Sequence, residues 1–220
     1  MAKIVIFGIG DNAQLAYYYL SKDTEHEVVA FSVDGDFITE DTFCDLPVRD
    51  FKNIESVYSP MEYKMFITIG YTQVNQLRAL KYLEAKQKGY ELISYISPRA
   101  TIYDNVLVGE NCFILEDNTI QPFVTIGNNV VLWSGNHVGH HSTVGDHCFI
   151  TSQVVISGRT NIGAYTFIGV NSTLRDHINI GERCVIGAGS IIMRDTNENE
   201  VYIPERTPVY IKKSQELGRI

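Results

Sequence analysis

The spacing of hydrophobic positions divides the chain into two parts with different periods. From Ile102 to Ile192 an aliphatic residue recurs at every sixth position, and no insertion interrupts the series. The sixteen positions are Ile102, Val108, Ile114, Ile120, Ile126, Leu132, Val138, Val144, Ile150, Ile156, Ile162, Ile168, Leu174, Ile180, Ile186 and Ile192. This period predicts a hexapeptide repeat that folds as a parallel β-helix.

The repeat also predicts which residues stack on one another. Each hexad forms a short strand and a corner, and its aliphatic residue and the residue two before it point inward. Three hexads form a triangular coil, so residues eighteen apart lie above one another, and roughly five coils rise by about 4.8 Å each. Glycine directly follows the aliphatic position in eight hexads. We expect these glycines to adopt the unusual backbone conformation of a corner.

The first hundred residues have the pattern of an α/β domain. An apolar strand at Lys3–Phe7 precedes a glycine-rich turn, a helix is predicted over Ala13–Leu20, and a second strand over Glu27–Ser32. The turn contains Gly8, Gly10, Asn12 and Ala13 in a G-x-G-x-x-A spacing, and Asp34 follows about twenty residues later. Such a turn places a nucleotide phosphate at a helix N-terminus, and the later acid can contact the ribose.

The remainder of this part is short. We expect a loop over Phe43–Val48, a strand over Lys64–Ile69 that ends at Gly70, a helix over Val74–Gln87 and a fourth strand over Glu91–Ile96. A dinucleotide-binding domain normally has six strands. Three interpretations therefore stay open: a mononucleotide pocket, a complete NAD site, or a structural cap for the end of the β-helix.

Two composition changes indicate the domain boundaries. Ser97-Pro98 separates the α/β pattern from the repeats, because proline interrupts a hydrogen-bonded ladder. The hexad register ends after Met193-Arg194-Asp195. The sequence thus predicts a Rossmann-like domain over 1–95, a β-helix over 96–193 and a capping tail over 194–220.

Charge and composition exclude several classes of function. The 220 residues carry a net charge of −8, which argues against a nucleic-acid surface. No apolar run reaches the ~18 residues of a membrane span. The first apolar run enters a glycine turn instead of a cleavage site, which predicts a cytoplasmic protein. Cys112, Cys148 and Cys184 share one inward column and are interpreted as small core residues instead of metal ligands or disulfide partners.

Four of the six histidines lie within eleven residues, at His137, His140, His141 and His147. Because Val138 and Val144 point inward, we expect all four imidazoles to point outward or to lie at corners. Three interpretations of the cluster are open: ordinary surface histidines, a zinc site, or a general base.

The spacing separates the two chemical alternatives. Zinc-binding hexapeptide proteins of the carbonic anhydrase type have two ligands five residues apart, whereas Ser142 and Gly145 stand five after His137 and His140. A histidine near its free pKa of about 6.5 accepts a proton at neutral pH. Gly158 is predicted one coil from His140, where a backbone N–H could stabilise a developing oxyanion. This pair suggests acyl transfer, with no metal.

These motifs resemble the bacterial nucleotide-sugar acyltransferases of the sialic-acid O-acetyltransferase-like (NeuD/PglD) group. The resemblance covers the glycine-rich turn, Val33-Asp34, Ile69-Gly70, the hexads and the segment from His140 to Asp146. It implies a Rossmann-like domain followed by a left-handed β-helix, and a homotrimer with active sites between subunits. It also implies N-acetylation of the 4-amino group of a nucleotide-linked 4-amino-4,6-dideoxysugar, with acetyl-CoA as the donor.

The resemblance assigns roles to individual residues. His140 would be the general base, His141 its neighbour in the catalytic motif, and Gly158 the N–H donor to the thioester carbonyl. The nucleotide sugar would contact Gly8, Gly10, Asn12, Asp34 and Gly70. Acetyl-CoA would contact Gly158, Gly169, Gly187, Ala188 and Gly189.

Two segments depart from the family pattern. His141 stands where the family often has an acid that orients the base, and Tyr202–Pro208 replaces a Gly-x-Pro-Ala-Lys segment against which CoA often packs. Two other functions remain as alternatives: O-acetylation of a sugar hydroxyl, and a non-catalytic trimeric scaffold that binds nucleotide sugars.

Overall fold

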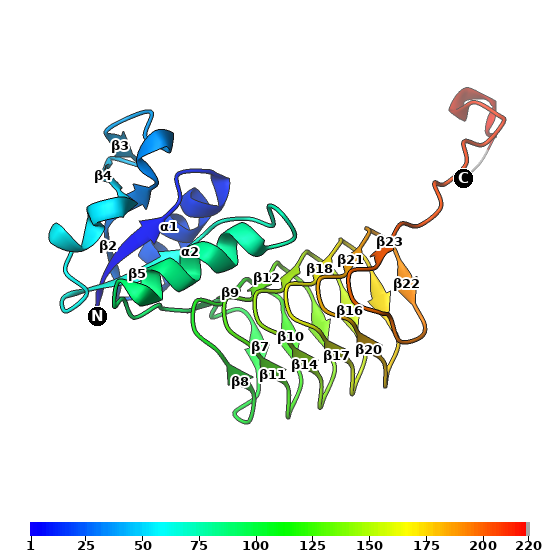
Figure 1. Ribbon diagram of the computed structural model, residues 1–220. Helices are drawn as coiled ribbons and strands as arrows, with labels where there is room; N and C mark the ends of the chain where they lie inside the picture. Colours follow the sequence, from blue (N-terminus) through cyan, green and yellow to red (C-terminus); the bar gives the residue numbers. More distant parts are fainter. Residues whose placement is uncertain (219–220) are drawn as a thin grey trace.

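The computed structural model describes residues 1–218 and consists of an α/β part packed against one end of a long β-helix (Figure 1). The first part has a five-stranded sheet in the order β3-β4-β2-β1-β5. Its strands are β1 (Lys3–Phe7), β2 (Glu27–Val33), β3 (Thr42–Phe43), β4 (Leu46–Asp50) and β5 (Tyr63–Ile67). All pair in parallel except β3 with β4.

Helices α1 (Asp11–Asp23) and α2 (Gln76–Gln87) complete this part, with short 3-10 turns η1 (Gly35–Phe37) and η2 (Phe51–Ser56). The alternating residues of β1 serve two separate cores. Ile4 and Ile6 join the core that contains Ala16 of α1, whereas Val5 and Phe7 join the core that contains Ala85 of α2. Both faces of the sheet are therefore buried, as the apolar run in β1 requires.

Two local expectations for this part are wrong. Residues 43–48 were expected as a loop but form most of a hairpin, because Cys44 and Asp45 adopt φ values of 50° and 62° and make a two-residue turn without glycine. The fourth strand does not join this sheet. Only Leu92 bridges to Met65, and β6 (Tyr95–Ile96) instead pairs with β9 of the β-helix.

The second helix also begins later than expected, at Gln76 instead of Val74. Gln73, Val74 and Asn75 all have positive φ, at 53°, 50° and 66°. A right-handed helix cannot include such residues. The preceding loop therefore turns sharply before the helix starts.

The repeats form a left-handed parallel β-helix, as expected, with three sheets of six, five and seven strands. Every neighbouring pair is parallel, and most partners are eighteen residues apart, such as Val138 with Ile156. The strands are β7 (Thr101–Ile102), β8 (Leu107–Val108), β9 (Phe113–Ile114), β10 (Thr119–Ile120), β11 (Thr125–Ile126), β12 (Val131–Leu132), β13 (His137–Val138), β14 (Thr143–Val144), β15 (Phe149–Ile150), β16 (Val155–Ile156), β17 (Asn161–Ile162), β18 (Phe167–Ile168), β19 (Thr173–Leu174), β20 (Asn179–Ile180), β21 (Val185–Ile186), β22 (Ile191–Ile192) and β23 (Val201–Tyr202).

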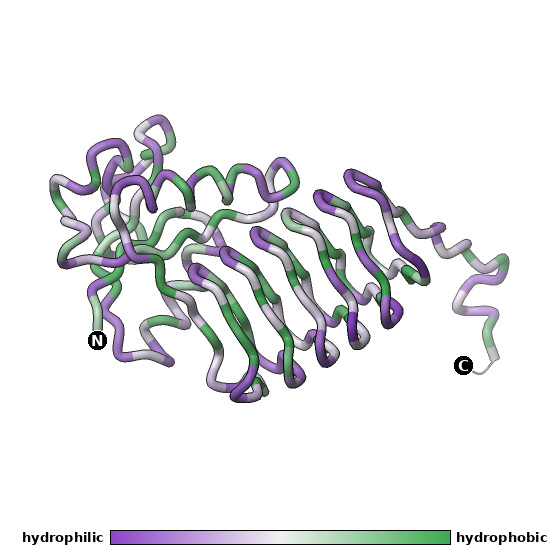
Figure 2. The backbone as a smooth tube through the Cα atoms, turned by 60° about the horizontal axis from the view of Figure 1, so that its bottom comes forward, coloured by the Kyte–Doolittle hydropathy of each residue, from purple (hydrophilic) through white to green (hydrophobic). Residues whose placement is uncertain are grey.

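The predicted inward positions form the core of the coils. The aliphatic residues from Ile114 to Ile192 are at most 5% exposed, and Cys112, Cys148 and Cys184 are completely buried among them. Polar and apolar stretches alternate around each coil (Figure 2). After β23 the chain leaves the coils as an exposed tail that includes η3 (Ser214–Glu216), far from the α/β part (Figure 1).

The reason for the repeated glycines differs from the expected one. None of the eight glycines after the aliphatic positions has positive φ; the left-handed residues lie two positions later and are not glycine in seven of the eight hexads, as at Asn129 and His141. A Cβ on Gly145 would instead lie 2.7 Å from the backbone nitrogen of Ala164 in the next coil. Glycine is needed here because the backbones of successive coils approach too closely for a side chain.

The two parts of the chain share a continuous interface. The α/β part packs on the sheet that contains β9, β12 and β15, where Phe113, Val131 and Phe149 belong to the same core as Ile4 and Phe66. This interface therefore covers the first coils of one of the three faces of the β-helix.

Arg78 of α2 holds the two parts together through hydrogen bonds. Its guanidinium is completely buried and donates to the carbonyl oxygens of Asn129, His147 and Cys148 in the β-helix and of Gly70 in its own part. Burial lowers the pKa of Arg78 to about 10. The residue is thus still a cation at neutral pH, and carbonyl dipoles solvate it in place of water.

His147 lies at a corner, which is one of the two placements expected for it, but that corner is buried in the same interface. It is 7% exposed, its ring packs against Tyr82 and Tyr165, and its Nδ1 lies 2.9 Å from the side-chain Nδ2 of Asn129. Burial is the main cause that lowers the pKa of His147 to about 4, with Asp146 opposing and Arg78 adding to the shift. The register alone places this residue at a corner; the docked α/β part covers that corner.

The low pKa of His147 predicts acid sensitivity. An unfolded histidine has a pKa of about 6.5, so between pH 6.5 and 4 only the unfolded chain binds this proton. The free energy of unfolding should fall by about 3 kcal/mol from this group as the pH decreases through that window. Urea unfolding of wild type and of His147→Asn at pH 7 and pH 4.5 tests this, because the variant lacks the titrating group. Equal pH dependence in the two proteins would contradict it.

Candidate active site

One corner of the β-helix gathers the residues expected to perform chemistry. Residues 139–142 connect β13 to β14 and carry His140 and His141. The His140 N–H donates to the Gln121 side-chain oxygen at 2.9 Å, and the His141 N–H donates to the Pro122 carbonyl at 3.2 Å. Both imidazoles are exposed at this corner, and their backbone is anchored to the preceding coil.

Gly158 lies directly beside the His140 ring, as the eighteen-residue stacking predicts. A Cβ on Gly158 would lie 2.9 Å from both Cε1 and Nε2 of His140. The next residue, Arg159, donates its N–H to the His140 carbonyl at 2.9 Å. The Gly158 N–H itself finds no hydrogen-bond acceptor within residues 1–218. A side chain at position 158 would therefore displace the His140 ring, whereas glycine leaves the ring in place beside the Gly158 N–H.

The rings of His140 and His141 contact each other. Their Nδ1 atoms are 3.1 Å apart, and the His141 ring also packs on Phe123 with a centroid separation of 4.6 Å. Desolvation, followed by the charges of Arg159 and His140, lowers the pKa of His141. These contacts bring together His140, His141 and Gly158, the three residues for which catalytic roles are expected. His137 lies on strand β13 and makes no hydrogen bond to them in the described chain.

Four of the five predicted nucleotide residues line one pocket. Gly8, Gly10, Asn12 and Gly70 surround a cavity of about 360 Å³ at the N-terminus of α1. Thr68 and Ile69, at the carboxyl end of β5, also line this cavity. Their position after a parallel strand could have identified them, because ligands bind outside the carboxyl ends of such strands.

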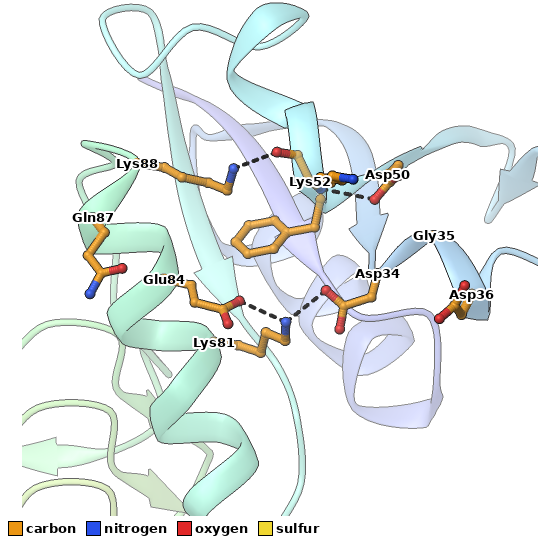
Figure 3. A pocket seen from close by; sticks show the side chains of 10 residues that line it. Asp34, Gly35, Asp36, Asp50, Lys52, Lys81, Glu84, Gln87 and Lys88 are labelled. Carbon is orange, nitrogen blue, oxygen red and sulfur yellow. Dashed lines mark hydrogen bonds and ion pairs between the residues drawn. The ribbon is translucent and has the colours of Figure 1, made fainter.

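Asp34 lies elsewhere. It lines a separate cavity of about 700 Å³ together with Asp50 and Lys88 (Figure 3). Its carboxylate accepts a hydrogen bond from Lys81 at 2.7 Å, and the same ammonium donates to Glu84 at 2.7 Å. The structure thus separates Asp34 from the other four residues and pairs its charge with α2. Lys81 is 47 residues away in sequence, so no local pattern reveals this ion pair.

The expected acetyl-CoA residues are divided between two corners. Gly158 is in the corner that follows β16, whereas Gly169 and the run 187–189 lie in the corner that follows β18 and β21. These corners border opposite edges of the sheet that contains β16 and β19. Gly189 has φ of 75° and open space around it. Within one chain these glycines do not form a single pocket.

The described residues hold no metal cluster, and two of the buried cysteines have thiols that ionise poorly. Within residues 1–218 no group of three His, Cys, Asp or Glu side chains is arranged to bind a metal. Burial raises the pKa of Cys112 to about 11 and that of Cys148 to about 12. Thiols with such pKa values are poor nucleophiles. As far as residues 1–218 are concerned, neither helix has the length and apolar character that a bilayer span requires.

Comparison with known proteins identifies the repeat and the fold. The sequence model of the bacterial transferase hexapeptide family (six repeats) matches residues 123–158 and 159–194. No curated protein sequence matches this chain. Among solved structures, a histidine mutant of perosamine N-acetyltransferase from Caulobacter crescentus, in complex with CoA and GDP-perosamine, has a TM-score of 0.83 and 23% identity, and the match covers 91% of this chain and 93% of that one.

Two further structures are similar over the same range. The acetyltransferase domain of PglB from Neisseria gonorrhoeae FA1090 has a TM-score of 0.80 and 20% identity, covering 91% of this chain and 96% of that domain. WeeI from Acinetobacter baumannii AYE has a TM-score of 0.76 and 16% identity, covering 91% and 96%. The chain therefore carries bacterial transferase hexapeptide repeats and shares the two-part fold of these proteins.

Proposed function

We propose that this chain, with its bacterial transferase hexapeptide repeats, is an acetyl-CoA-dependent acetyltransferase that acts on the 4-amino group of a nucleotide-linked 4-amino-4,6-dideoxysugar. One observation carries the proposal: an exposed imidazole, His140, lies against a glycine, Gly158, whose N–H has no partner in the described chain. A base beside an available N–H is what acyl transfer from a thioester needs. Perosamine N-acetyltransferase, which shares the fold, binds CoA and an amino sugar linked to GDP.

The proposed reaction is a direct transfer. The neutral sugar amine attacks the thioester carbonyl carbon, a C–N bond forms, and the carbonyl electron pair moves to oxygen. The Gly158 N–H stabilises this oxyanion, and Nε2 of His140 removes a proton from the attacking nitrogen. When the tetrahedral intermediate collapses, the C–S bond breaks and the thiolate takes a proton from His140. The reaction needs no cysteine nucleophile, in agreement with the raised pKa values of Cys112 and Cys148.

The nucleotide part of the acceptor would bind at Gly8, Gly10, Asn12 and Gly70. The cavity there opens at the N-terminus of α1, where unpaired N–H groups and the helix dipole favour phosphate. Asp34 is ion-paired with Lys81 in a neighbouring cavity. For Asp34 to contact the ribose, its carboxylate would have to accept a hydrogen bond from the ribose while it stays paired with Lys81, or the ion pair would have to break. The donor would lie along the sheet edges marked by Gly158, Gly169 and Gly187–Gly189.

The topology supports a trimer with shared sites. The α/β part covers the β9-β12-β15 sheet, whereas His140 lies at the corner between the other two sheets. In one chain the nucleotide pocket and the base are thus on different sides of the triangular coil, so a second copy would complete the site. At a nucleotide-sugar concentration well below KM, mixed trimers of His140→Ala and Gly10→Val chains should turn over faster than either variant alone, because some sites then combine an intact base with an intact pocket. Mixtures that are no faster than the two separate variants after refolding together would contradict shared sites.

Thiol release from acetyl-CoA in the presence of a panel of nucleotide-linked sugars tests the activity itself. The proposal expects release with 4-amino sugars and formation of an amide product by mass spectrometry. Release only with sugars that lack an amine would favour O-acetylation. No release with any acceptor, although nucleotide sugars bind, would indicate a binding scaffold instead.

Gly10 offers a selective test of the nucleotide pocket. Its φ of −99° is accessible to any residue, and a Cβ there would meet no atom within 4 Å. Gly10→Val should therefore fold normally but occupy the cavity, and raise the KM for the nucleotide sugar about tenfold or more. The KM for acetyl-CoA should stay unchanged. Gly8→Ala is the contrasting variant: its φ of 131° and a Cβ 2.7 Å from Thr68 Oγ1 predict lost stability.

A further inference from the structure

The contact between His140 and His141 restricts where their protons can be. Two Nδ1 atoms at 3.1 Å form a hydrogen bond only when one of them carries a proton and the other offers a lone pair. Two neutral arrangements satisfy this condition. Either His140 donates and its Nε2 is unprotonated, or His141 donates and the Nε2 of His140 carries the proton. Only the first arrangement leaves a base that faces Gly158.

The surroundings of the pair contain no carboxylate. The coil before contributes Gln121, Pro122 and Phe123, and the coil after contributes Ser157, Gly158 and Arg159. Among these corner residues of the described chain, Arg159 has the only charged side chain, and it is a cation. After desolvation, the charge of Arg159 is the next cause that lowers the pKa of His141. None of these corner residues offers a carboxylate that would stabilise an added proton on the pair.

The His141 ring is also fixed in position. Its backbone adopts φ of 59°, its N–H is bonded to the Pro122 carbonyl, and its ring packs on Phe123. The contact to His140 is made by Nδ1, so the remaining ring nitrogen, Nε2, is free to carry the His141 proton. His141 can thus accept a hydrogen bond from His140 without competing for the space beside Gly158.

We propose that His140 and His141 act as a neutral imidazole pair, in which His141 is a positioning residue that keeps the His140 proton on Nδ1 and leaves Nε2 as the base. This inference rests on the acetyl-transfer function proposed above. It has a consequence for pH. One proton added to the pair, on either ring, leaves a proton on Nε2 of His140 and removes the base, so a single protonation of the pair abolishes activity.

Three replacements of His141 separate positioning from packing. His141→Asn keeps an acceptor and tolerates positive φ, so kcat should stay within a few-fold of wild type. His141→Phe keeps the packing on Phe123 but loses the acceptor; kcat should fall up to about a hundredfold with unchanged Tm and KM. His141→Glu should keep high activity but move the acid limb of the kcat/KM profile upward by about one pH unit, because a carboxylate stabilises protonated His140.

The tautomer can be measured without turnover. In ¹⁵N NMR spectra of histidine-labelled protein near pH 8, His140 should show a protonated Nδ1 and an unprotonated Nε2 in wild type and His141→Asn, and a mixed tautomer in His141→Phe. A protonated Nε2 on His140 in wild type, or equal kcat in wild type and His141→Phe, would overturn the pair. If the wild type transfers acetyl to no acceptor while the NMR result holds, the proposed function fails and the pair stands.

Discussion

Replacing His140 by alanine should lower kcat by about 10²- to 10⁴-fold, the range that general acid–base catalysis contributes. The KM values for both substrates should change little, because the imidazole acts on the proton that leaves in the transition state. The side chain is exposed, and its one hydrogen-bond partner within residues 1–218 is His141. The Tm should therefore stay within a few degrees of wild type. Steady-state kinetics and a thermal melt measure both quantities on the same preparation.

His26→Ala is a suitable control for His140→Ala, since it removes a half-buried imidazole of the α/β part whose one hydrogen bond among residues 1–218 is accepted from the Ala2 N–H. Its kcat should equal that of wild type. Near-normal turnover of His140→Ala on a good acceptor would exclude His140 as the base. The remaining histidine of the corner, His141, would then be the first candidate to examine.

Replacing Gly158 by alanine should lower kcat by about a hundredfold through the position of His140. The backbone of Gly158 is not in the left-handed region, so alanine is compatible with it. The added Cβ, however, would lie 2.9 Å from Cε1 and Nε2 of His140, and the exposed ring must move away. Because a mobile side chain yields, the free energy of unfolding should change by less than about 1 kcal/mol.

Gly163→Ala provides the matched contrast to Gly158→Ala. A Cβ on Gly163 would lie 2.5 Å from the backbone nitrogen of Glu182, which cannot move without separating two coils. That variant should lose stability yet keep the kcat of its folded fraction. In the double variant Gly158→Ala with His140→Ala, the two losses should not add, because both act through one ring. Wild-type kcat in Gly158→Ala would refute the proposed contact.

The six-residue register of aliphatic positions predicted most of the architecture of the β-helix. It located the core of every coil, the parallel pairing and the position of Gly158 beside His140. The prediction for Gly158 succeeded because this residue follows His140 by eighteen positions. One coil of the repeat has that length, so the two residues lie in neighbouring coils at the same corner. The same register showed where the repeated glycines lie but did not explain why glycine is needed there. The reason is the close approach of the backbones of two successive coils, which the sequence of one corner does not reveal.

Expectations failed where a contact joins segments with no common period. His147 occupies an outward corner by register, yet the docked helix α2 and its Arg78 bury it. The turn at Cys44 and Asp45 has no glycine to indicate it, and strand β6 pairs with the β-helix instead of the first sheet. For His147 and for β6, the residues that contact the segment are distant from it in sequence. The local amino-acid preferences of a segment do not show which distant residues it will contact.

The sequence by itself determined the β-helix, the glycine-rich turn before α1 and the candidates for the base and the oxyanion donor, because these depend on spacing along one repeat or one strand-turn-helix unit. Only the tertiary structure decided that Asp34 pairs with Lys81, that the predicted donor glycines lie at two corners, and that the His140 and His141 rings meet through Nδ1. The physical reason is that side-chain direction and domain docking depend on packing between distant residues. The pattern of residue types predicts the course of the backbone, whereas the packing of distant neighbours determines which side-chain atoms are in contact.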